Sequence, residues 1–377
     1  MYPRDFVPPS HQSYFLFGPR GTGKSMFVRN HYPNGLYFDI LDAKNFNEFT
    51  ADPSRLSDRI PEDFNDWIIV DEIQKVPALL NEIHRLIEQR NLHFVLTGSS
   101  SRRLKNKNVN LLAGRCLTCH LYPLTASEQG NDFDLARALD YGQLPLACTS
   151  ADPELFLQSY VQTYLQEEIQ LEGLTRNLPA FTRFLEAASF SQGSLLNISA
   201  IARDCAVKRK VVENYFSILR DTLISYEIPV FRKRAKRDTT QSNKYYFFDA
   251  GVFRTLRPTG PYDSDSEAKG IALETLVLQE IIAVNSYKRW NYSIYYWRTR
   301  LGKEVDFVLY GKRGLKAIEV KLSNRIRSKD FNGLKQFKQE YPEANLIYLY
   351  SGSRRFNEHD VEVVPVDLFF KQVDTLI

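Results

Sequence analysis

The sequence has no apolar run near the ~18 residues that a membrane-spanning helix needs. Its first residues, Met1-Tyr2-Pro3-Arg4-Asp5, do not resemble the start of a signal peptide. Cysteine is also scarce, with four residues in a chain of 377, which fits a reducing compartment. These absences predict a cytoplasmic protein with no membrane partner.

One cysteine pair needs separate treatment, because Cys116-Leu117-Thr118-Cys119-His120 spells the c-type haem attachment pattern. Haem attachment follows export, and we expect no export signal here. Cys148 and Cys205 stand too far apart to supply the second ligand pair of a zinc site. We therefore interpret residues 116–121 as a strand that matches the haem pattern by chance.

Net charge is small, at +4, but it is unevenly distributed. Residues 203–237 hold ten Lys or Arg against four acids, a local net charge of +6 that exceeds the charge of the whole chain. Such a segment is a candidate site for a nucleic-acid backbone. The overall composition, 43% hydrophobic and 25% charged, is that of a globular protein, and the length predicts two or three domains.

A complete phosphate-loop pattern, GxxxxGK[ST], lies between an apolar run at 14–17 and a stretch that can open a helix at 26–28. It reads Gly18-Pro19-Arg20-Gly21-Thr22-Gly23-Lys24-Ser25. The glycines let several backbone N–H groups point at one anion, and the helix start adds a partial positive charge. We expect the whole loop to bind the phosphates of ATP, with Lys24 on the β- and γ-phosphates and the Ser25 hydroxyl on Mg²⁺.

Two further polar strand ends predict the hydrolytic machinery. The apolar run Trp67-Ile68-Ile69-Val70 ends in Asp71-Glu72, of which Asp71 is expected to hold Mg²⁺ through water and Glu72 to activate the attacking water. The run 93–97 leads into Ser99, and either Thr97 or Ser99 is placed to contact the γ-phosphate or that water; each hydroxyl could equally belong to a serine-rich turn.

Strands and helices alternate through this region, which predicts a doubly wound parallel sheet. The expected strands are 14–17, 36–40, 67–72, 93–97 and 116–121, with a helix over 76–89. Arg115 precedes the last strand and is a candidate arginine finger for the nucleotide of a neighbouring subunit. Arg102 and Arg103 compete for that role, and a solvated surface arginine is the plain alternative.

The middle of the chain, from about Asp134 to Glu186, is expected to be helical. It leads to a helix over 197–204, a turn at 205–207 and a helix over 208–220, followed by strands at 221–226 and 230–231. This order is typical of a winged helix-turn-helix. The basic run 208–210 would begin the recognition helix and 232–237 would lie in the wing; a solvated basic face used for protein contacts is the alternative.

The last third holds a second constellation of charged residues. Glu274 lies in an apolar helix, and a strand at 294–298 is followed by strands that carry Asp306 with Glu304, then Glu319 with Lys321. Side chains two apart on a strand share a face, so Asp306 and Glu319 can hold Mg²⁺ while Lys321 assists attack on a phosphodiester. An amphipathic hairpin with solvated acids is the alternative.

The chain as a whole resembles the prokaryotic P-loop ATPases of the AAA superfamily that carry a C-terminal domain of unknown function. The N-terminal part of this resemblance rests on Gly18 to Ser25, Ile68 to Glu72, Leu96 to Ser100, Gly114-Arg115 and Tyr122 to Thr125. The C-terminal part rests on the helix-turn-helix, Phe248-Asp249-Ala250-Gly251, Leu273-Glu274, Glu304 to Phe307 and Ile318 to Lys321. That last set resembles the PD-(D/E)XK restriction-endonuclease-like fold.

The resemblance implies ATP binding and hydrolysis with Mg²⁺ and, in the C-terminal part, acids that hold metal and a lysine that assists hydrolysis. Such nuclease-like domains often keep the fold and lose the activity. The sequence departs from ring-forming AAA motors because no clear lid-domain arginine follows Arg115. This departure puts a hexameric ring in doubt and leaves a homo-oligomer and a nucleotide-controlled switch both open.

The sequence thus predicts a multidomain α/β protein with a P-loop ATPase domain (1–130), a helical and winged-helix middle (131–240) and a restriction-endonuclease-like domain (241–377). We expect an ATP-hydrolysing protein whose nucleotide state controls a nuclease-like region that binds nucleic acid, DNA in preference to RNA. The alternatives are a metal-dependent DNA endonuclease in its own right, or a nucleotide-dependent signalling switch with an inactive nuclease-like domain.

Overall fold

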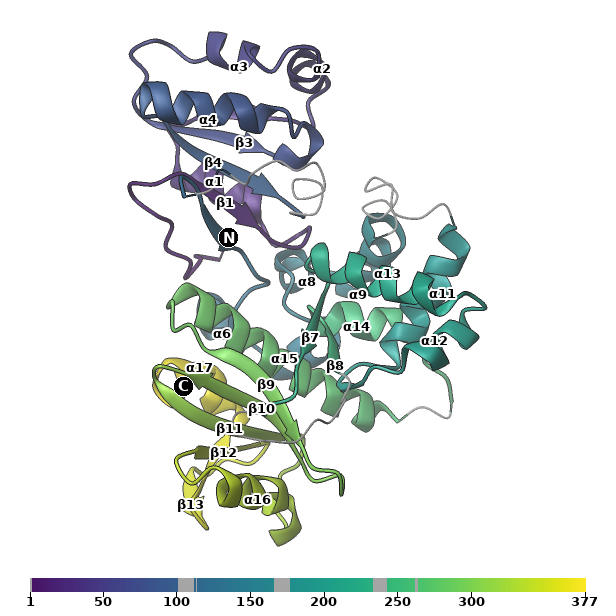
Figure 1. The fold of residues 1–377 in the computed structure, drawn as a ribbon. Helices are drawn as coiled ribbons and strands as arrows, with labels where there is room; N and C mark the ends of the chain where they lie inside the picture. Colours follow the sequence, from purple (N-terminus) through teal and green to yellow (C-terminus); the bar gives the residue numbers. More distant parts are fainter. Residues whose placement is uncertain (1, 101–111, 113, 166–176, 233–242, 262–263) are drawn as a thin grey trace. The chain divides into compact units, whose positions relative to one another are not determined.

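The computed structural model describes residues 2–100, 112, 114–165, 177–232, 243–261 and 264–377 (Figure 1). Its contacts divide the chain into two compact units. The N-terminal unit comprises Arg4–Tyr122 with Asp221–Ile224, and the C-terminal unit comprises Met1–Pro3, Pro123–Arg220 and Ser225–Ile377. No helix among the described residues is long and apolar enough to cross a membrane.

The N-terminal unit is built on a five-stranded sheet in the order β2-β3-β4-β1-β5, in which all the neighbouring strands run parallel. The strands are β1 (Tyr14–Phe17), β2 (Leu36–Asp39), β3 (Trp67–Asp71), β4 (His93–Gly98) and β5 (Leu117–His120). The predicted parallel sheet is confirmed. Because β4 lies between β1 and β3, the ends of these three strands meet at one edge.

Helices cover both faces of this sheet (Figure 1). They are α1 (Lys24–His31), α2 (Ala43–Ala51), α3 (Arg55–Asp58), the 3₁₀ turn η1 (Ile73–Lys75) and α4 (Leu79–Arg90). Alternate strand residues such as Phe15, Ile68 and Phe94 pack with Leu79 and Ile83 of α4 in one core. On the other face the Tyr14 hydroxyl bonds that of Tyr32, just after α1, at 2.9 Å.

The C-terminal unit begins with short helices, as the sequence predicts for the described part of 134–186. They are α6 (Ala126–Gln129), the 3₁₀ turn η2 (Gly130–Asp132), α7 (Leu135–Tyr141), α8 (Pro145–Thr149), α9 (Pro153–Ser159), the π-helix η3 (Tyr160–Leu165) and α11 (Leu178–Ser189). A side-chain cap fixes the start of several of these helices, for example Asp134 at α7 and Asp152 at α9.

Two helices and a small antiparallel sheet follow. They are α12 (Ile198–Asp204), α13 (Arg209–Asp221), β6 (Ser194–Leu195), β7 (Ser225–Ile228) and β8 (Lys244–Phe247), with strand order β6-β8-β7. The predicted helix boundaries are nearly right, but the strand predicted at 221–226 starts later, because α13 runs on to Asp221 and Leu223 has a positive φ of 61°. The predicted strand at 230–231 is reduced to an isolated bridge between Val230 and Tyr296.

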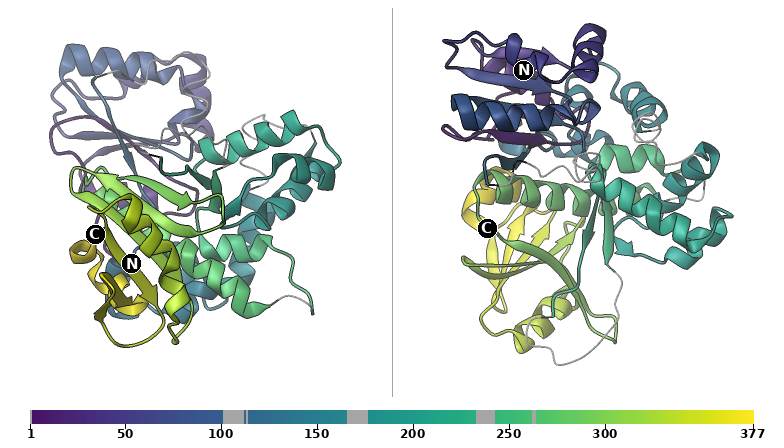
Figure 2. Two further views of the ribbon diagram at one scale, coloured as in Figure 1. Left: turned by 60° about the horizontal axis from the view of Figure 1, so that its bottom comes forward. Right: turned by 45° about the horizontal axis from the view of Figure 1, so that its top comes forward.

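The rest of the C-terminal unit is a six-stranded mixed sheet in the order β13-β14-β12-β11-β10-β9 (Figure 2). Its strands are β9 (Ser293–Arg298), β10 (Glu304–Gly311), β11 (Gly314–Lys321), β12 (Asn345–Tyr350), β13 (Phe356–Glu358) and β14 (Val361–Pro365). Its helices are α14 (Ala250–Leu256), α15 (Asp265–Tyr287), the 3₁₀ turn η4 (Ser328–Phe331), α16 (Asn332–Glu340) and α17 (Val366–Leu376). The core on one face includes α15 and α17, and the core on the other includes α16.

Candidate functional sites

The phosphate loop joins β1 to α1 at the carboxyl edge of the five-stranded sheet, where the sequence predicts it. Gly21 and Gly23 have φ angles of 83° and 89°, a left-handed conformation that glycine adopts without a steric penalty. A Cβ at Gly18 would lie 2.2 Å from the Leu121 carbonyl oxygen, so glycine is required there too. Gly23 is the N-cap of α1 and makes no side-chain hydrogen bond, so no cap side chain covers the first backbone N–H groups of the helix.

The interior of the loop holds the Lys24 ammonium. Lys24 is 6% exposed, and its Nζ donates to the carbonyl oxygens of Gly18 at 2.8 Å and Pro19 at 3.1 Å. The Thr22 hydroxyl donates to the same Pro19 oxygen at 2.9 Å. Arg20 and Ser25 are half-buried, Ser25 as the second residue of α1. The loop therefore keeps one cation inside a ring of backbone, which suits a ligand with several negative oxygens.

Asp71 ends β3 with both carboxylate oxygens engaged by hydroxyl groups. It is 3% exposed, and it accepts hydrogen bonds from Thr97 of β4 on Oδ1 and from Tyr37 of β2 on Oδ2. The pKa of Tyr37 is raised, first by burial and then by its hydrogen bond to Asp71, so this hydroxyl stays a donor. Both of these partners are hydroxyl groups, which bring no positive charge to the carboxylate.

Glu72 follows Asp71 in a left-handed backbone conformation, with φ 63° and ψ 43°. This conformation is unfavourable for a residue with a side chain, and such residues are concentrated at functional sites. The Glu72 amide donates to the Thr97 hydroxyl at 3.2 Å. The Thr97 hydroxyl therefore accepts a hydrogen bond from the backbone of Glu72 and donates one to the side chain of Asp71.

Gln74 connects Glu72 to Ser99. Its amide Nε2 donates to Glu72 Oε2 and, at 3.1 Å, to the hydroxyl of Ser99 just beyond β4. Gln74 and Ser99 are each 3% exposed. The two hydroxyl candidates from the sequence thus differ in their contacts: Thr97 contacts Asp71, and Ser99 contacts the amide that holds Glu72.

Arg115 lies at the amino-terminal ends of the strands, whereas the phosphate loop lies at their carboxyl ends. It precedes β5, and the neighbouring Gly114 oxygen accepts a hydrogen bond from Gln12, which precedes β1. Its guanidinium pairs with Glu88 of α4. Since the phosphate loop follows the other end of β1, this position does not favour a finger role within the same chain. Arg102 and Arg103 fall outside the described residues.

A cluster of charged side chains in the C-terminal unit brings together most of the second predicted site. It consists of Glu274 from α15, Glu304 and Asp306 from β10, Glu319 and Lys321 from β11, and Lys244 from β8, and we call it the acidic cluster. Asp306 is 7% exposed and Glu319 9%. Asp306 Oδ2 accepts from the Val320 amide at 2.9 Å, and Lys321 Nζ lies 3.5 Å from Glu319 Oε1.

Burial controls the protonation of this cluster. It raises the pKa of Glu274 to about 7, and it raises the pKa of Glu319 well above the usual range, with the Asp306 charge adding to the effect. Burial acts against the charged form of Lys244, but Glu274, Tyr246, Asp306 and Glu304 together raise its pKa well above the usual value. Lys244 is therefore a cation, and the cluster can hold a proton on a carboxyl group.

The structure gives little support to a metal among these acids. No group of three or more His, Cys, Asp or Glu in the described parts of the chain is arranged to hold a metal ion. One oxygen of Asp306 accepts from the backbone and the other faces Lys244 at 3.5 Å. Glu319 Oε2 is buried without a hydrogen-bond partner. Lys321 pairs with Glu319, and Asp306 on the neighbouring strand faces the Lys244 ammonium.

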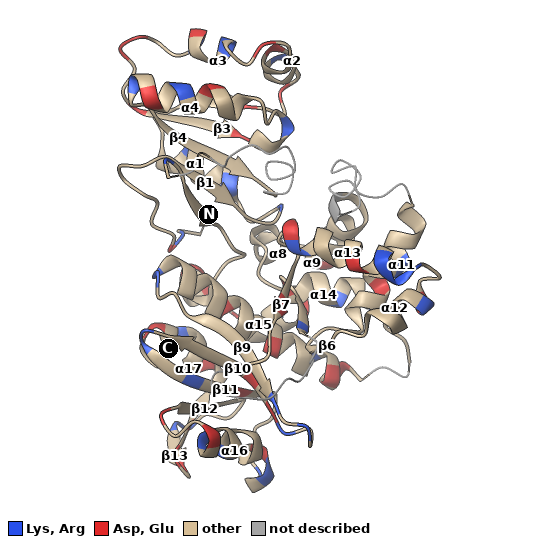
Figure 3. Cartoon of the chain, viewed as in Figure 1, with Lys and Arg blue, Asp and Glu red and all other residues tan. Residues whose placement is uncertain are grey.

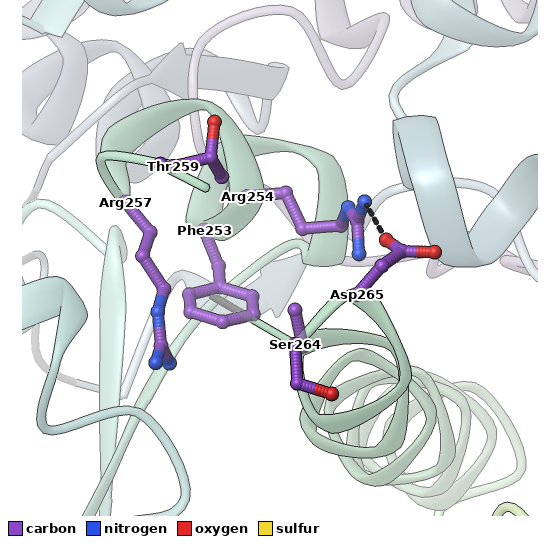
Figure 4. A pocket seen from close by; sticks show the side chains of 8 residues that line it. Phe253, Arg254, Arg257, Thr259, Ser264 and Asp265 are labelled. Atoms are coloured by element: carbon purple, nitrogen blue, oxygen red, sulfur yellow. Dashed lines mark hydrogen bonds and ion pairs between the residues drawn. The ribbon is translucent and has the colours of Figure 1, made fainter. Parts of the chain in front are cut away.

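A pocket of about 330 Å³ lies between α14 and the start of α15, and none of the residues that the sequence singled out lines it (Figure 4). Arg254 points toward Asp265 at 2.9 Å, and Lys269 contacts Asp265 at 3.0 Å and Asp140 at 3.5 Å. Arg254 is also 3.4 Å from Asp140. The lining itself holds Arg254, Arg257 and Asp265, so the pocket carries a small net positive charge.

The basic segment is described in part. Lys208, Arg209 and Lys210 are exposed where α13 begins, and Arg209 contacts Glu213 at 2.8 Å. Figure 3 marks the Lys and Arg positions of the described residues in blue. Residues 233–237 of the predicted wing fall outside the described residues. The predicted basic run thus lies at the start of α13, the helix that follows α12.

Two motifs of the resemblance have structural contacts. Asp249 is fully buried and caps α14, accepting from the amides of Val252 at 3.1 Å and Gln143 at 2.7 Å. Burial raises its pKa to about 6. Thr125 and Glu128 form a capping box at α6, whose Ala126 amide donates to Glu280 of α15 at 3.1 Å. These residues join helices to the core of the C-terminal unit.

Comparison with known families finds three matching family models along the chain. Residues 10–129 match the model of a family described as an AAA domain. The N-terminal unit is therefore similar to AAA-type P-loop domains. Residues 133–263 and 269–369 match two further families, both described as domains of unknown function (DUF8612 and DUF4143), so these matches leave the C-terminal function open.

Individual relatives are distant. An uncharacterized protein of Haemophilus influenzae is 23% identical over 206 residues, which cover 50% of this chain and 52% of that protein. The match thus spans about half the length of the relative. Among solved structures, the Aeropyrum pernix ORC1 protein in complex with DNA is 15% identical with a TM-score of 0.28, covering 66% of this chain and 87% of that one.

A second solved structure, the Bacillus subtilis DNA clamp loader delta protein, is 16% identical with a TM-score of 0.23, covering 56% of this chain and 84% of that one. Both structural likenesses are too weak to support an assignment.

Three residues with central contacts were missed by the sequence reasoning. Gln74 and Tyr37 contact the two acids of the AAA domain, and Lys244 occupies the acidic cluster. Lys244 had one signal, because it begins the otherwise apolar run Lys-Tyr-Tyr-Phe-Phe, and a lysine buried in such a strand needs acidic partners. Gln74 and Tyr37 had no comparable signal.

Proposed function

We propose that this protein binds and hydrolyses ATP, and that its nucleotide state controls how the C-terminal unit binds DNA. The observation that carries the first part is the convergence at one sheet edge of the phosphate loop after β1, the acids after β3 and the hydroxyls after β4. The bonds from Thr97 to Asp71 and from Gln74 to both Glu72 and Ser99 support one connected site.

Each residue has a role in this proposal that follows from its place. Residues Gly18 to Ser25 bind the phosphates through backbone N–H groups, and Lys24 leaves its two carbonyl acceptors to contact the β- and γ-phosphates. Ser25 and Asp71 are suited to hold Mg²⁺, which supplies positive charge that neutralises the phosphates when bound. Glu72 orients the attacking water and accepts its proton, and Ser99 contacts the γ-phosphate.

Arg115 has a role in this proposal only between subunits. Its position at the far edge of its own sheet, paired with Glu88, is compatible with reaching the nucleotide of a neighbouring copy. The proposal therefore includes a homo-oligomer in which ATP turnover depends on protein concentration. An Arg115→Ala variant would then lose turnover while still binding ATP.

The DNA-binding part rests on the exposed basic residues at the start of α13 and on the helix-helix-sheet order of that region, which supports a winged helix. The last residue of α13 and the three residues after it, Asp221–Ile224, belong to the N-terminal unit. A change of nucleotide state in that unit can therefore act on a segment covalently joined to the basic helix.

Two further candidates concern the acidic cluster. The convergence of Asp306, Glu319 and Lys321 favours a metal-dependent DNA endonuclease. The engagement of Asp306 by Lys244 favours a switch with an inactive nuclease-like domain. Incubation with single-stranded, duplex and branched DNA plus Mg²⁺ or Mn²⁺, beside Asp306→Ala, separates them, because cleavage by the wild type alone supports the endonuclease.

The ATPase proposal is tested by ATP turnover of the wild type and of Lys24→Ala. Loss of the buried ammonium is expected to reduce turnover at least ~100-fold. Lys44→Ala, an exposed lysine on α2 of the same unit, is the matched control and should keep full turnover. Equal turnover in Lys24→Ala and the wild type would contradict the assignment.

A further inference from the structure

The acidic cluster contains a buried lysine where the resemblance to nucleases leads one to expect a metal. Lys244 has a side chain that is 3% exposed, and its Nζ lies 3.3 Å from Glu274 Oε1 and 3.5 Å from Asp306 Oδ1. A third carboxylate oxygen, Glu304 Oε1, also forms an ion pair with Nζ. An ammonium has three N–H donors and no acceptor, so the three carboxylate oxygens match its donors in number, and those of Glu274 and Asp306 accept hydrogen bonds from it.

These three acids come from two different elements, and the lysine comes from a third. Glu274 lies on α15, Glu304 and Asp306 lie on β10, and Lys244 begins β8. Backbone pairing fixes Lys244 on both sides, opposite Leu195 of β6 and Ile228 of β7. The ammonium therefore links the three-stranded sheet to the six-stranded sheet and to α15, and the strand that carries it is held at a defined register.

Formal charges show what this lysine replaces. The four carboxylates of the cluster, Glu274, Glu304, Asp306 and Glu319, face Lys244, Lys321 and Arg298, which contacts Glu304 Oε2 at 3.1 Å. With all four carboxylates ionised one negative charge is left over, and a proton held on Glu274 or Glu319 removes it, so too little charge remains to favour a divalent ion in a buried site. Without Lys244 the same side chains would carry two uncompensated negative charges, which a divalent cation matches.

We propose that the Lys244 ammonium is the resident cation of this cluster, and that the cluster is a junction between the two sheets that binds no divalent metal. The C-terminal unit then binds its partner without cutting a phosphodiester, since its Asp306 and Glu319 have no metal to present. This inference does not depend on ATP hydrolysis, so either can fail without the other.

The direct test is Mn²⁺ binding by the nucleotide-free full-length chain, followed by electron paramagnetic resonance. An Asp71→Asn background removes the carboxylate of the AAA domain that is suited to hold metal. We expect no binding by this parent protein at millimolar Mn²⁺. Lys244→Met, which keeps an unbranched side chain one atom shorter and removes the charge, is expected to bind Mn²⁺ at least ~10-fold more tightly than the parent.

Two controls make the result specific. Lys316→Met removes a half-buried lysine of β11 that lies outside the cluster, where its Nζ donates to the Leu376 carbonyl at 3.0 Å. This variant should gain no metal binding. Adding Asp306→Asn to Lys244→Met should abolish the gain. Thermal unfolding supplies a second readout, because Mn²⁺ should raise the Tm of Lys244→Met and leave that of the parent unchanged.

Two results would overturn the proposal. One is Mn²⁺ binding by the parent protein that Asp306→Asn abolishes, a measurement that needs no lysine variant to fold. The other is a folded Lys244→Met that binds Mn²⁺ no better than Lys316→Met. The absence of binding in the parent together with a gain in Lys244→Met supports the lysine as the resident cation.

Discussion

The hydroxyl of Thr97 donates a hydrogen bond to the carboxylate of Asp71 and accepts one from the amide of Glu72. This one side chain thus ties the end of β4 to both acids at the end of β3. The strand order that puts β4 between β1 and β3 makes the contact possible, and it places the same hydroxyl beside the strand that leads into the phosphate loop. Thr97 is therefore a positioning residue for both acids.

Thr97→Val keeps the shape of the side chain and removes its hydroxyl. We expect ATP turnover to fall ~10-fold or more while ATP affinity stays within ~3-fold, because Asp71 and Glu72 lose their alignment and the phosphate loop is unchanged. Steady-state turnover and equilibrium nucleotide binding measure the two effects. Thr118→Val, on the exposed side of β5, is the matched control. A normal turnover rate in Thr97→Val would exclude the positioning role.

Glu72→Gln removes the proposed base and keeps the side chain's size. Hydrolysis is expected to fall at least ~100-fold with ATP binding retained, since the group that accepts the proton of water is lost. Gln74→Leu should have a smaller effect of the same kind, because Glu72 loses the amide donor that orients it. Single-turnover hydrolysis with bound ATP separates chemistry from binding. Loss of ATP binding in Glu72→Gln would indicate a structural role instead.

Asp249 gives the C-terminal unit a dependence of stability on pH. Its pKa in the folded protein is raised from 3.8 to about 6 by burial, so the protonated form is favoured by folding. The stability that this group contributes is complete below its unfolded pKa and is lost as pH rises through about 6. The difference corresponds to about 3 kcal/mol, at roughly 1.4 kcal/mol for each pKa unit.

Asp249→Asn removes this titration. The free energy of unfolding of the wild type, relative to that of the variant, should decrease between about pH 4 and about pH 7 and then stay constant. Denaturant unfolding at a series of pH values measures it. Asp367→Asn, an exposed residue of α17, should show no such trend. A difference that is constant with pH would show that folding does not shift the pKa of Asp249.

The exposed lysines before and within the start of α13 carry the DNA-binding proposal. Lys208→Glu with Lys210→Glu should weaken DNA binding. It should also lower the slope of log Kd against log salt concentration by ~2, because two contacts to phosphate are lost. Lys288→Glu with Lys371→Glu makes the same charge change on other exposed lysines of the C-terminal unit and is the control. Equal losses in both pairs would point to nonspecific attraction.

The sequence was most informative where the residues of one short, continuous segment determine both its local structure and its proposed role. The phosphate loop and the strands ending at Asp71 and Gly98 are local patterns of apolar runs and glycines, and the structure has them where the patterns indicate. The strand pair carrying Asp306 and Glu319 was also predictable, because alternation fixes which side chains share a face.

Contacts between distant segments were beyond the same reasoning. Lys244 meets acids 30, 60 and 62 residues away through the packing of two sheets, and no local pattern encodes that packing. The strand predicted at 221–226 was misplaced because the apolar run continues smoothly from a helix, and only the backbone turn at Leu223 separates the two. The link from Gln74 to Ser99 joins two strand ends and is likewise tertiary.

The central claim is that nucleotide state controls DNA binding, and the most direct measurement is the DNA affinity of the Glu72→Gln protein with ATP, with ADP and without nucleotide. The account predicts that the Kd differs by ~10-fold or more between the ATP-bound and nucleotide-free states. It also predicts that Lys24→Ala binds DNA with one Kd in all three conditions. The same Kd for Glu72→Gln in every nucleotide state, with ATP binding verified, would contradict the account.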